Sequence, residues 1–467
     1  MAFTEFCCRS GGSNLNAGTR TGNSTEPGTA ADLTYASGTW VSVTGVFTPA
    51  SGDPSADGVA VGDFASVYAD GATVTTLVGR VTARTTTTIT VSTTAKSGTT
   101  TDGTSNRTLK IGGAWQGPNG TSGFPLTFSM VGCTNAAADP VAINLKNDAT
   151  YSITAAIAGV GSSAILTQGY TTSYHDGGYA LINGGTSGAS YTLFTPNGAG
   201  TKYFRNLKFG NNGATGSADG VIAGDRTQWS QCVFFGMRGS GFAGAASETL
   251  HECEAYGNNL SNTAGKGGFV ASSCFNCISH DNTGSNTAGF VAATNGLPNV
   301  FIGCIADTNG GVGFSDKGLR GVAIINCDAY NNTGSGISIT GSTAVVHNCN
   351  LIKNGGWGIA STAAQYIAVN CGIGSGTQAN ASGSFQLDQL VSGTVTYASN
   401  VTPWTDPANG DFRISLAAAQ GTGRGSFTQT AASYAGTVGY PDIGAAQSQA
   451  SGSSGIPIAR GMHGGMR

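Results

Sequence analysis

The chain has 467 residues, a formal net charge of −3 and only 10% charged residues. Average soluble domains carry roughly 25% charged residues, and here Ser, Thr and Asn supply most of the polarity. The sequence shows neither the basic face that nucleic-acid binding needs nor an apolar run long enough to insert into a membrane. Its opening segment lacks the basic and apolar regions of a conventional secretion signal, so we expect synthesis in a cytoplasm.

The N-terminal quarter of the chain is rich in strand-like segments. We expect an irregular lead at residues 1–37. Residues 38–96 contain runs such as WVSVTGVFTPA and TLVGRVTAR, separated by Gly, Asp and Pro, which predicts a small β-barrel or sandwich module. Residues 97–124 would connect this module to the remainder of the chain.

A loose repeat occupies the central region. Cysteines recur at intervals of 21–27 residues, an asparagine stands five residues after five of them, and a glycine followed by an apolar residue comes next. Three markers in phase at a period of about 22 residues indicate a solenoid. The markers are Cys232, Cys253, Cys277, Cys304, Cys327, Cys349 and Cys371, with Asn258, Asn282, Asn309, Asn332 and Asn354.

Residues on either side of each cysteine alternate in character. Those two positions before and after it are mostly apolar or small, and the one immediately before it is polar or glycine. This alternation predicts strands with one inward face, shared by the cysteine and the residues two positions away on each side. Coils of this length are the unit of a parallel β-helix, which we place at residues 125–395. We expect the cysteines to form a core ladder, the asparagines a turn ladder with left-handed backbone, and the glycines the other corners.

The cysteines could instead bind a metal or form disulfides. Zinc sites need paired ligands, and only Cys274 and Cys277 have that spacing. Their separation of three predicts that the two sulfurs lie on opposite faces of a strand. Stacked side chains point in parallel, so we expect free core thiols, few disulfides, no metal and no cofactor. Cys7 and Cys8 are expected to be more exposed.

After the repeat, residues 396–447 are expected to cap the last coil, because its strand edges would otherwise be open. Residues 448–467 begin as a Ser/Gly-rich linker and end in a short basic piece. A flexible tail is the simpler interpretation. A peptide that docks on a neighbouring subunit is the alternative.

The sequence contains no defined catalytic set. Cleavage of a polysaccharide would need two acids about 5–10 Å apart, or a basic proton acceptor with a cation. The candidates on the predicted outward face are the carboxylates Glu252, Glu254, Asp307 and Asp328, the first two on one side of a strand, beside a glycan-binding strip of Tyr256, His280 and Tyr330. We favour the simpler interpretation, a solvated outer face.

Other residues on the coils receive structural interpretations. His251 and His347 share the predicted inward parity, so we expect them to be packed. The nearest basic cluster, Arg205, Lys208, Arg226 and Arg238, matches no lyase motif. Apolar residues predicted to face outward would line one side of the solenoid and suggest a partner surface, which leads to the hypothesis of a homotrimer; they are Val233, Phe235, Ile278, Ile305 and Ile352.

Several passages resemble the right-handed parallel β-helix proteins of pectate-lyase-like fold. They are RSGGSNLNAGT at residues 9–19, the Asn-turn coils at 200–375, and TDPANGDFRISLAAAQG…GYPDIGAAQ at 405–447. The segment that runs from VAVGDFASVYADG to TITVSTT, and TLKIGGAWQGPNG after it, resembles modules of β-helix proteins encoded by tailed phages. The resemblance implies an all-β chain: a right-handed parallel β-helix with a small N-terminal β-module and a C-terminal cap.

The resemblance also implies a function. We expect a structural virion protein of a tailed phage, such as a capsid-decorating, spike or fibre protein, that associates with capsid or tail proteins and binds bacterial surface polysaccharide. One alternative is a polysaccharide-degrading enzyme, a lyase or glycoside hydrolase such as a tailspike depolymerase. Another is a non-catalytic glycan-binding adhesin. We expect a non-enzymatic role and a location in the virion.

Overall fold

The structure, a computed structural model, describes residues 4–9, 17, 30–70, 72, 77–98, 102–112, 141–148, 150–154, 156–158, 165–196, 201–244, 247–293, 298–317, 321–341, 343–361, 366–369 and 371–374, and short strands at 390–391, 395–396, 404–406 and 411–414. The chain forms two compact units, Met1–Gly185 with Thr192–Gly210, and Thr186–Tyr191 with Asn211–Arg467. In the described ranges, no helix combines the length and hydropathy that a membrane span requires.

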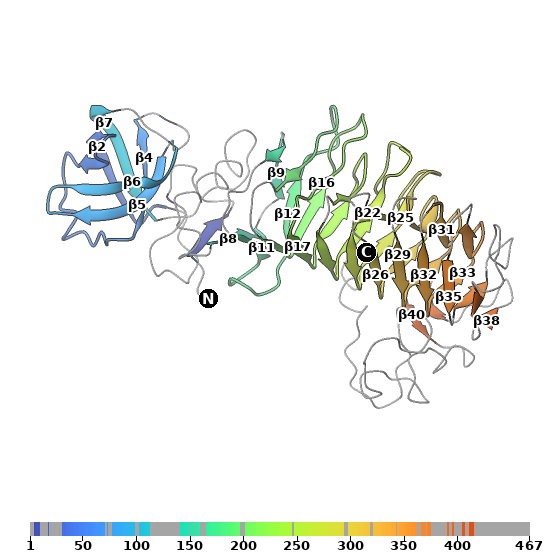
Figure 1. The fold of residues 1–467 in the computed structure, drawn as a ribbon. Coiled ribbons are helices and arrows are strands. Elements are labelled where there is room, and N and C mark those ends of the chain that lie inside the picture. Colours follow the sequence, from blue (N-terminus) through green and yellow to red (C-terminus); the bar gives the residue numbers. More distant parts are fainter. Residues whose placement is uncertain are drawn as a thin grey trace, which may run out of the picture. The chain divides into compact units, whose positions relative to one another are not determined.

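The first unit contains a closed antiparallel barrel, which confirms the predicted β-module (Figure 1). Its strands are β2 (Leu33–Val41), β3 (Val46–Thr48), β4 (Phe64–Ala69), β5 (Leu77–Arg84), β6 (Ile89–Gly98) and β7 (Gly103–Ile111), in the order β2-β3-β6-β5-β4-β7. Trp40, Phe47 and Leu109 are among the side chains that fill its core. The barrel extends beyond the predicted range of 38–96, because β2 begins earlier and β7 uses part of the expected connector.

The same unit contains the first coils of the β-helix. Their strands are β8 (Val141–Lys146), β9 (Thr150–Ser152), β10 (Ile157–Ala158), β11 (Ile165–Tyr170), β12 (Ala180–Asn183), β13 (Phe194–Thr195), β14 (Lys202–Arg205) and β15 (Leu207–Gly210). An additional strand, β1 (Thr4–Cys8), pairs in parallel with β8. Cys7 and Cys8 are both buried in it, so the expectation that they are exposed is wrong. The reason is that this part of the lead joins the sheet instead of remaining irregular.

The second unit is a β-solenoid in which every complete coil contributes one strand to each of three parallel sheets (Figure 1). Sheet 1 consists of β17 (Thr227–Ser230), β20 (Thr249–His251), β23 (Ser273–Phe275), β26 (Asn299–Ile302), β29 (Val322–Ile325), β32 (Ala344–His347), β35 (Tyr366–Val369) and β37 (Leu390–Val391). Sheet 2 consists of β18 (Val233–Phe235), β21 (Glu254–Tyr256), β24 (Ile278–His280), β27 (Ile305–Asp307), β30 (Asp328–Tyr330), β33 (Asn350–Ile352), β36 (Gly372–Gly374) and β38 (Val395–Thr396).

Sheet 3 completes each coil. It consists of β16 (Val221–Ile222), β19 (Phe242–Ala243), β22 (Gly267–Ala271), β25 (Ala288–Ala292), β28 (Val312–Ser315), β31 (Ile337–Ile339) and β34 (Ile359–Ser361). A separate antiparallel pair, β39 (Trp404–Asp406) and β40 (Asp411–Ile414), follows the coils. Most of the predicted cap, and all of the predicted tail at 448–467, lie outside the described residues.

The cysteine ladder is confirmed as part of the core. All seven ladder cysteines are buried, and the ten cysteines that the structure describes are free thiols. The residues two positions after them are also inward, as predicted: Phe234, Ala255, Ser279, Ala306, Ala329, Leu351 and Ile373.

The inward residues of sheet 1 were predicted one position too close to the ladder cysteine. The residue before the ladder cysteine adopts a left-handed backbone, so the chain turns a corner there and the alternation of side chains restarts. The residues with positive φ are Gln231, Glu252, Asn276, Gly303, Asn326 and Asn348. The inward residues of sheet 1 therefore stand three positions before the cysteine: Trp229, Leu250, Cys274, Phe301, Ile324, Val346 and Ala368.

This corner overturns two further expectations. His251 is exposed and stacks on Phe275, and His347 is half-buried, so neither is packed inside. Cys274 and Cys277 do not face opposite ways. Both are buried in the core of the solenoid.

A second left-handed corner lies immediately before each ladder asparagine. The residues with positive φ are Gly257, Asp281, Thr308, Asn331 and Lys353, so the left-handed backbone predicted for the asparagines belongs to their predecessors. The turn ladder of asparagines is confirmed: Asn282 Nδ2 donates to Asn309 Oδ1 at 2.8 Å, and Asn309 Nδ2 donates to Asn332 Oδ1 at 2.9 Å. All five ladder asparagines are buried.

The recurring glycine of sheet 3 makes room for this ladder. A Cβ on Gly289 would lie 2.8 Å from the carbonyl oxygen of Gly313 and 2.9 Å from Asn309 Nδ2. A Cβ on Gly336 would meet the equivalent atoms of Gly358 and Asn354. These positions therefore require glycine because the coils approach each other closely there. They are not the tight corners with a positive φ that the sequence analysis expected.

Candidate functional site

The predicted site residues lie on sheet 2, whose strands are short because each is bounded by two left-handed corners. Equivalent residues of successive coils stand in register, so Glu254 lies between Val233 and Ile278, and His280 lies between Tyr256 and Asp307. Adjacent strands are about 4.8 Å apart. Each outward side chain is therefore flanked by its equivalents on the neighbouring coils.

This stacking buries several residues that were predicted to face solvent. Glu254 is 2% exposed, Asp328 is 0% and Tyr330 is 6%. The predicted apolar stripe is also largely buried, at Val233, Ile278, Ile305 and Ile352, whereas Phe235 is half-buried. The expectation of a solvated outer face is wrong for these positions, because neighbouring coils cover them.

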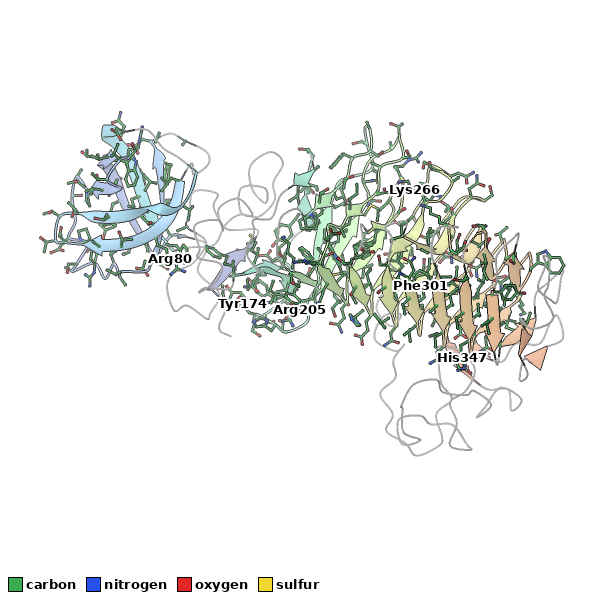
Figure 2. All side chains as sticks on the ribbon, viewed as in Figure 1. Arg80, Tyr174, Arg205, Lys266, Phe301 and His347 are labelled. Atoms are coloured by element: carbon green, nitrogen blue, oxygen red, sulfur yellow. The ribbon has the colours of Figure 1, made fainter. Side chains whose placement is uncertain are left out.

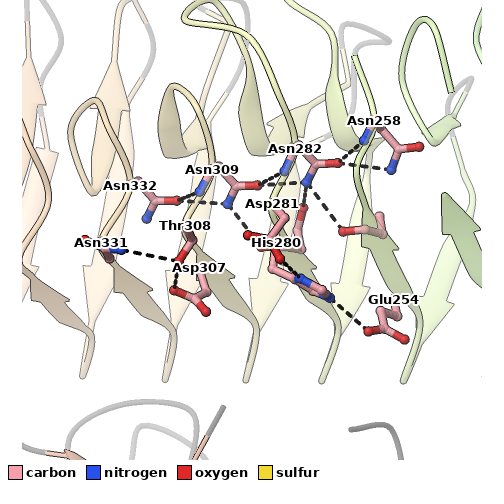
Figure 3. A network of polar contacts seen from close by, with 12 residues as sticks. Glu254, Asn258, His280, Asp281, Asn282, Asp307, Thr308, Asn309, Asn331 and Asn332 are labelled. Carbon is pink, nitrogen blue, oxygen red and sulfur yellow. Dashed lines mark hydrogen bonds and ion pairs between the residues drawn. The ribbon is translucent and has the colours of Figure 1, made fainter. Parts of the chain in front are cut away.

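The centre of the candidate site is a histidine held by two carboxylates (Figure 3). The Nε2 atom of His280 lies 2.9 Å from Oε1 of Glu254, and its Nδ1 atom lies 2.8 Å from Oδ2 of Asp281. The other carboxylate oxygen of Glu254, Oε2, is buried and has no hydrogen-bond partner among the described residues. Asp281 is one of the left-handed corner residues, so the second corner of the coil places its carboxylate beside the ring.

The electrostatics of this group favour a charged histidine. Burial alone would lower the pKa of His280, but the hydrogen bonds and charges of Asp281 and Glu254 outweigh burial and raise that pKa to about 9. At neutral pH both ring nitrogens therefore carry protons and donate to the carboxylates. In this state His280 acts as a fixed cation and has no lone pair available to accept a proton.

Asp307 lies next to His280 in the register of sheet 2. Burial raises the pKa of this carboxyl group to about 6, although a hydrogen bond from Thr308 Oγ1 and the charge of His280 oppose the rise. A carboxyl group that is partly protonated near neutral pH can act as a general acid. Asp307 and Glu254 stand two strands apart and two positions apart along the strands, so their backbones are roughly 12 Å apart.

An aromatic column continues from His280 along the same face. The ring of Tyr256 stacks on His280 with centroids 5.2 Å apart, and Phe235 stacks on Tyr256 with centroids 5.4 Å apart. All three side chains are half-buried. Tyr330 is on the far side of Asp307 in the register, and Lys353 Nζ lies 5.6 Å from its ring centroid.

The remaining predicted residues do not join this group. Glu252 is itself a left-handed corner residue and pairs with Gln231 Nε2, so it does not share a strand face with Glu254 as predicted. Asp328 is buried and accepts a hydrogen bond from Asn350 Nδ2. Asp281 was missed by the sequence analysis. The available signal was its position beside a ladder asparagine.

The four basic residues of the sequence analysis have separate contacts. Arg205 donates to Gln168 and lies 2.5 Å from His175 Nδ1, and Lys208 Nζ lies over the ring of Tyr179. Arg226 is a positive-φ residue, and Arg238 Nε donates to the carbonyl oxygen of Gly216. Within the described ranges, no group of three or more His, Cys, Asp or Glu side chains could hold a metal ion.

The first unit also contains a polar groove of about 630 Å³. Its lining includes the ring of Tyr179, the ammonium group of Lys208 and the carboxylate of Asp148. Asn147, Thr150 and Thr171 contribute further polar groups. An aromatic ring beside amide, hydroxyl and charged groups can hold a polar ligand by stacking and hydrogen bonding.

Comparison with known proteins supports the fold. Residues 204–373 match the family described as a right handed beta helix region. The matched segment lies within the coiled region, and its description agrees with the parallel sheets of the structure. No curated protein matches the chain.

The chain also shows partial similarity to solved structures. The chain is similar to the pectate lyase Pel9A (16% identity, TM-score 0.40, covering 71% of this chain and 95% of that one) and to ORF18 of Geobacillus virus E2 (14%, 0.39, 56% and 53%). It is also similar to the tailspike protein gp49 of Acinetobacter baumannii bacteriophage Fri1, a capsular polysaccharide depolymerase (12%, 0.29, 59% and 62%).

Proposed function

We propose that this chain is a structural β-helix protein of a tailed-phage virion, a capsid-decorating, spike or fibre protein that binds bacterial surface polysaccharide without cleaving it. The observation that carries the non-catalytic role is the burial of Glu254, whose side chain is 3% exposed and paired with His280. Glycoside hydrolysis requires two carboxyl groups that both reach the substrate. In this chain one of the two candidate carboxylates, Glu254, is already held in an internal ion pair with His280.

The interior of the solenoid supports a scaffolding role. Buried thiols, asparagine side chains and glycines repeat from coil to coil, and each ladder asparagine bonds to the next. Buried contacts and hydrogen bonds that repeat in every coil disfavour local unfolding, which suits a stiff element that resists proteolysis. The assignment to a phage particle rests on the sequence resemblance of the β-module, and of TLKIGGAWQGPNG after it, to β-helix proteins encoded by tailed phages.

Association with other subunits remains part of this proposal. The buried stripe at Val233, Ile278, Ile305 and Ile352 no longer supports a homotrimer. Two other apolar side chains, Val345 and Ile367, stand in register on sheet 1 and are 44% and 47% exposed. They are the better candidates for a contact between copies, and sedimentation equilibrium of the wild type and Val345→Glu would test it.

The decisive experiment for the proposed function determines where the chain is located. Particles of the phage whose genome encodes this chain would be purified by density gradient and examined by mass spectrometry and labelled antibody. We expect the full-length chain in intact particles, at a fixed position on the capsid or tail. Its absence from purified particles, with abundant chain in the lysate, would refute the virion role.

A second candidate function, polysaccharide cleavage, is favoured by Asp307 and its pKa of about 6. The test is release of reducing ends or unsaturated products from host capsular polysaccharide by the wild type, Asp307→Asn and Glu254→Gln. Asp225→Asn is a matched control, because Asp225 is exposed. Cleavage that is lost in both site variants and retained in the control would establish the enzyme, whereas no cleavage by the wild type supports the structural role.

A further inference from the structure

Two lysines and one aspartate meet in the second unit, away from sheet 2. Lys266 Nζ lies 2.6 Å from Oδ2 of Asp219, and Figure 2 marks Lys266. Asp219 is 8% exposed, and its Oδ1 accepts a hydrogen bond from the backbone amide of Ser240 at 2.7 Å. Both oxygens of this carboxylate are therefore already engaged, one by Lys266 and one by the backbone.

The second lysine, Lys317, follows β28 and extends over Gly265, the residue before Lys266. A Cβ on Gly265 would lie 2.9 Å from Lys317 Cε and 3.4 Å from its Nζ. The absence of a side chain at Gly265 thus allows the end of Lys317 to lie there. None of the described residues gives the Lys317 ammonium group a hydrogen bond or an ion pair.

The backbone of Lys317 is also unusual. Its φ is 50°, in the left-handed region that non-glycine residues seldom adopt. Backbone conformations of this kind are strained and persist only where the surrounding structure imposes them. The structure therefore holds this side chain in place at a cost, although it makes no polar contact there among the described residues.

The charges of the group are unbalanced. Burial and the neighbouring charge of Lys266 lower the pKa of Lys317, and Asp219 only partly opposes them. Two ammonium groups face one carboxylate, which leaves a formal charge of +1. Like charges placed together are unfavourable, and an added anion would relieve both the repulsion and the missing hydrogen bonds.

We propose that Lys266 and Lys317 form a binding site for a small oxyanion, namely the carboxylate or phosphate group of a ligand. Lys317 supplies the free ammonium donor, and Lys266, held by Asp219, supplies a second positive charge. The site does not depend on the proposed virion role, and it shares no residue with the group around His280.

The test uses the full chain with its lysines reductively methylated with ¹³C-formaldehyde, a modification that preserves their charge. The Lys317 resonance, assigned from Lys317→Met, is titrated with sodium phosphate, sodium glucuronate and glucose at constant ionic strength. We expect saturable shifts with phosphate, glucuronate or both, a rise in the pKa of Lys317 on binding, and no effect of glucose. The relative strength of the two anions distinguishes a phosphate from a sugar carboxylate as the source of the group.

Variants provide the controls. Lys317→Met should weaken anion binding by about tenfold or more, as expected for the loss of one charge-assisted hydrogen bond. Lys317→Arg should largely retain binding, because it keeps the cation. Lys353→Met is the matched control, since Lys353 is a lysine with positive φ on another coil. The proposal is overturned if no anion shifts Lys317 saturably, or if Lys317→Met and Lys353→Met bind the anion equally well.

Discussion

His280 donates from Nε2 to Oε1 of Glu254 at 2.9 Å, across two neighbouring strands of sheet 2, while its Nδ1 reaches Asp281 in its own coil. One imidazolium ring thus connects a buried carboxylate of one coil to a corner residue of the next coil. The pair is an internal ion pair of the solenoid, and it couples stability to pH.

The first prediction concerns His280. Its pKa of about 9 in the folded chain is above the ordinary value of 6.5, so folding favours the protonated ring. Its contribution to stability is therefore complete below about pH 6.5 and is lost as the pH rises through about 9. In His280→Gln we expect this pH dependence to disappear and the free energy of unfolding at pH 6 to fall by about 3 kcal/mol. Guanidinium unfolding at pH 6, 7.5 and 9 measures the free energy of unfolding and its dependence on pH. If stability depended on pH in the variant as it does in the wild type, the prediction would be contradicted.

The second prediction concerns Asp307. Its pKa is raised from 3.8 to about 6, so the folded state prefers the neutral acid, and this preference is lost as the pH rises through about 6. Asp307→Asn removes the cost of burying the charged form. We expect the variant to be more stable than the wild type by about 1–2 kcal/mol at pH 8 and nearly equal at pH 3. Thermal unfolding at the two pH values checks this, and a variant less stable at pH 8 would show that the carboxylate is stabilising.

The third prediction concerns the asparagine ladder. Asn309→Ala removes the bonds from Asn309 Nδ2 to Asn332 and to the carbonyl oxygen of Ser279, and it leaves buried groups on the neighbouring coils without partners. We expect a loss of about 1–3 kcal/mol in the free energy of unfolding. Asn286→Ala is the control, because Asn286 is exposed and should change stability by less than about 0.5 kcal/mol. Equal losses in the two variants would argue against the ladder.

The fourth prediction concerns the thiols. Burial raises the pKa of Cys327 and Cys349 well above its usual range, so they are neither accessible nor ionised. With an aromatic disulfide reagent the folded chain should release at most one equivalent of thiolate, from Cys133, which lies outside the described residues. All eleven thiols should react in guanidinium. Asp225→Cys, at an exposed position, should add one fast-reacting thiol, and fast reaction of several thiols in the folded wild type would contradict the buried ladder.

Much of the fold could be predicted because a solenoid repeats its packing. Cys232 to Cys371 recur in phase with the asparagines, and stacking of equivalent residues makes that phase visible along the chain. The barrel was recognisable from its alternating strands, although its ends were not, because β2 begins at Leu33 in the expected lead and β7 lies in the expected connector. The pairing of β1 with β8 joins residues about 135 positions apart, and no local pattern signals such a contact.

The candidate site was predicted less well. Tyr256, His280 and Asp307 were placed on one face of successive strands, and the structure brings them together in register. Their chemistry was not foreseen, because it depends on Asp281 and on the burial of Glu254 between Val233 and Ile278. Burial of an outward residue is set by the side chains of the coils on both sides, and one coil read by itself does not contain that information.

By itself, the sequence determined the solenoid, its period and its cysteine and asparagine ladders, since identical positions on stacked coils must satisfy the same packing and hydrogen-bonding demands. Only the tertiary structure decided which residues face inward on sheet 1 and what surrounds His280. The physical reason is a single left-handed residue before each ladder cysteine. Gln231, Glu252, Asn276 and Gly303 all adopt that conformation, although a glutamate or glutamine has no intrinsic preference for it. The stacked coils impose the corner, and the corner determines the face on which each side chain lies.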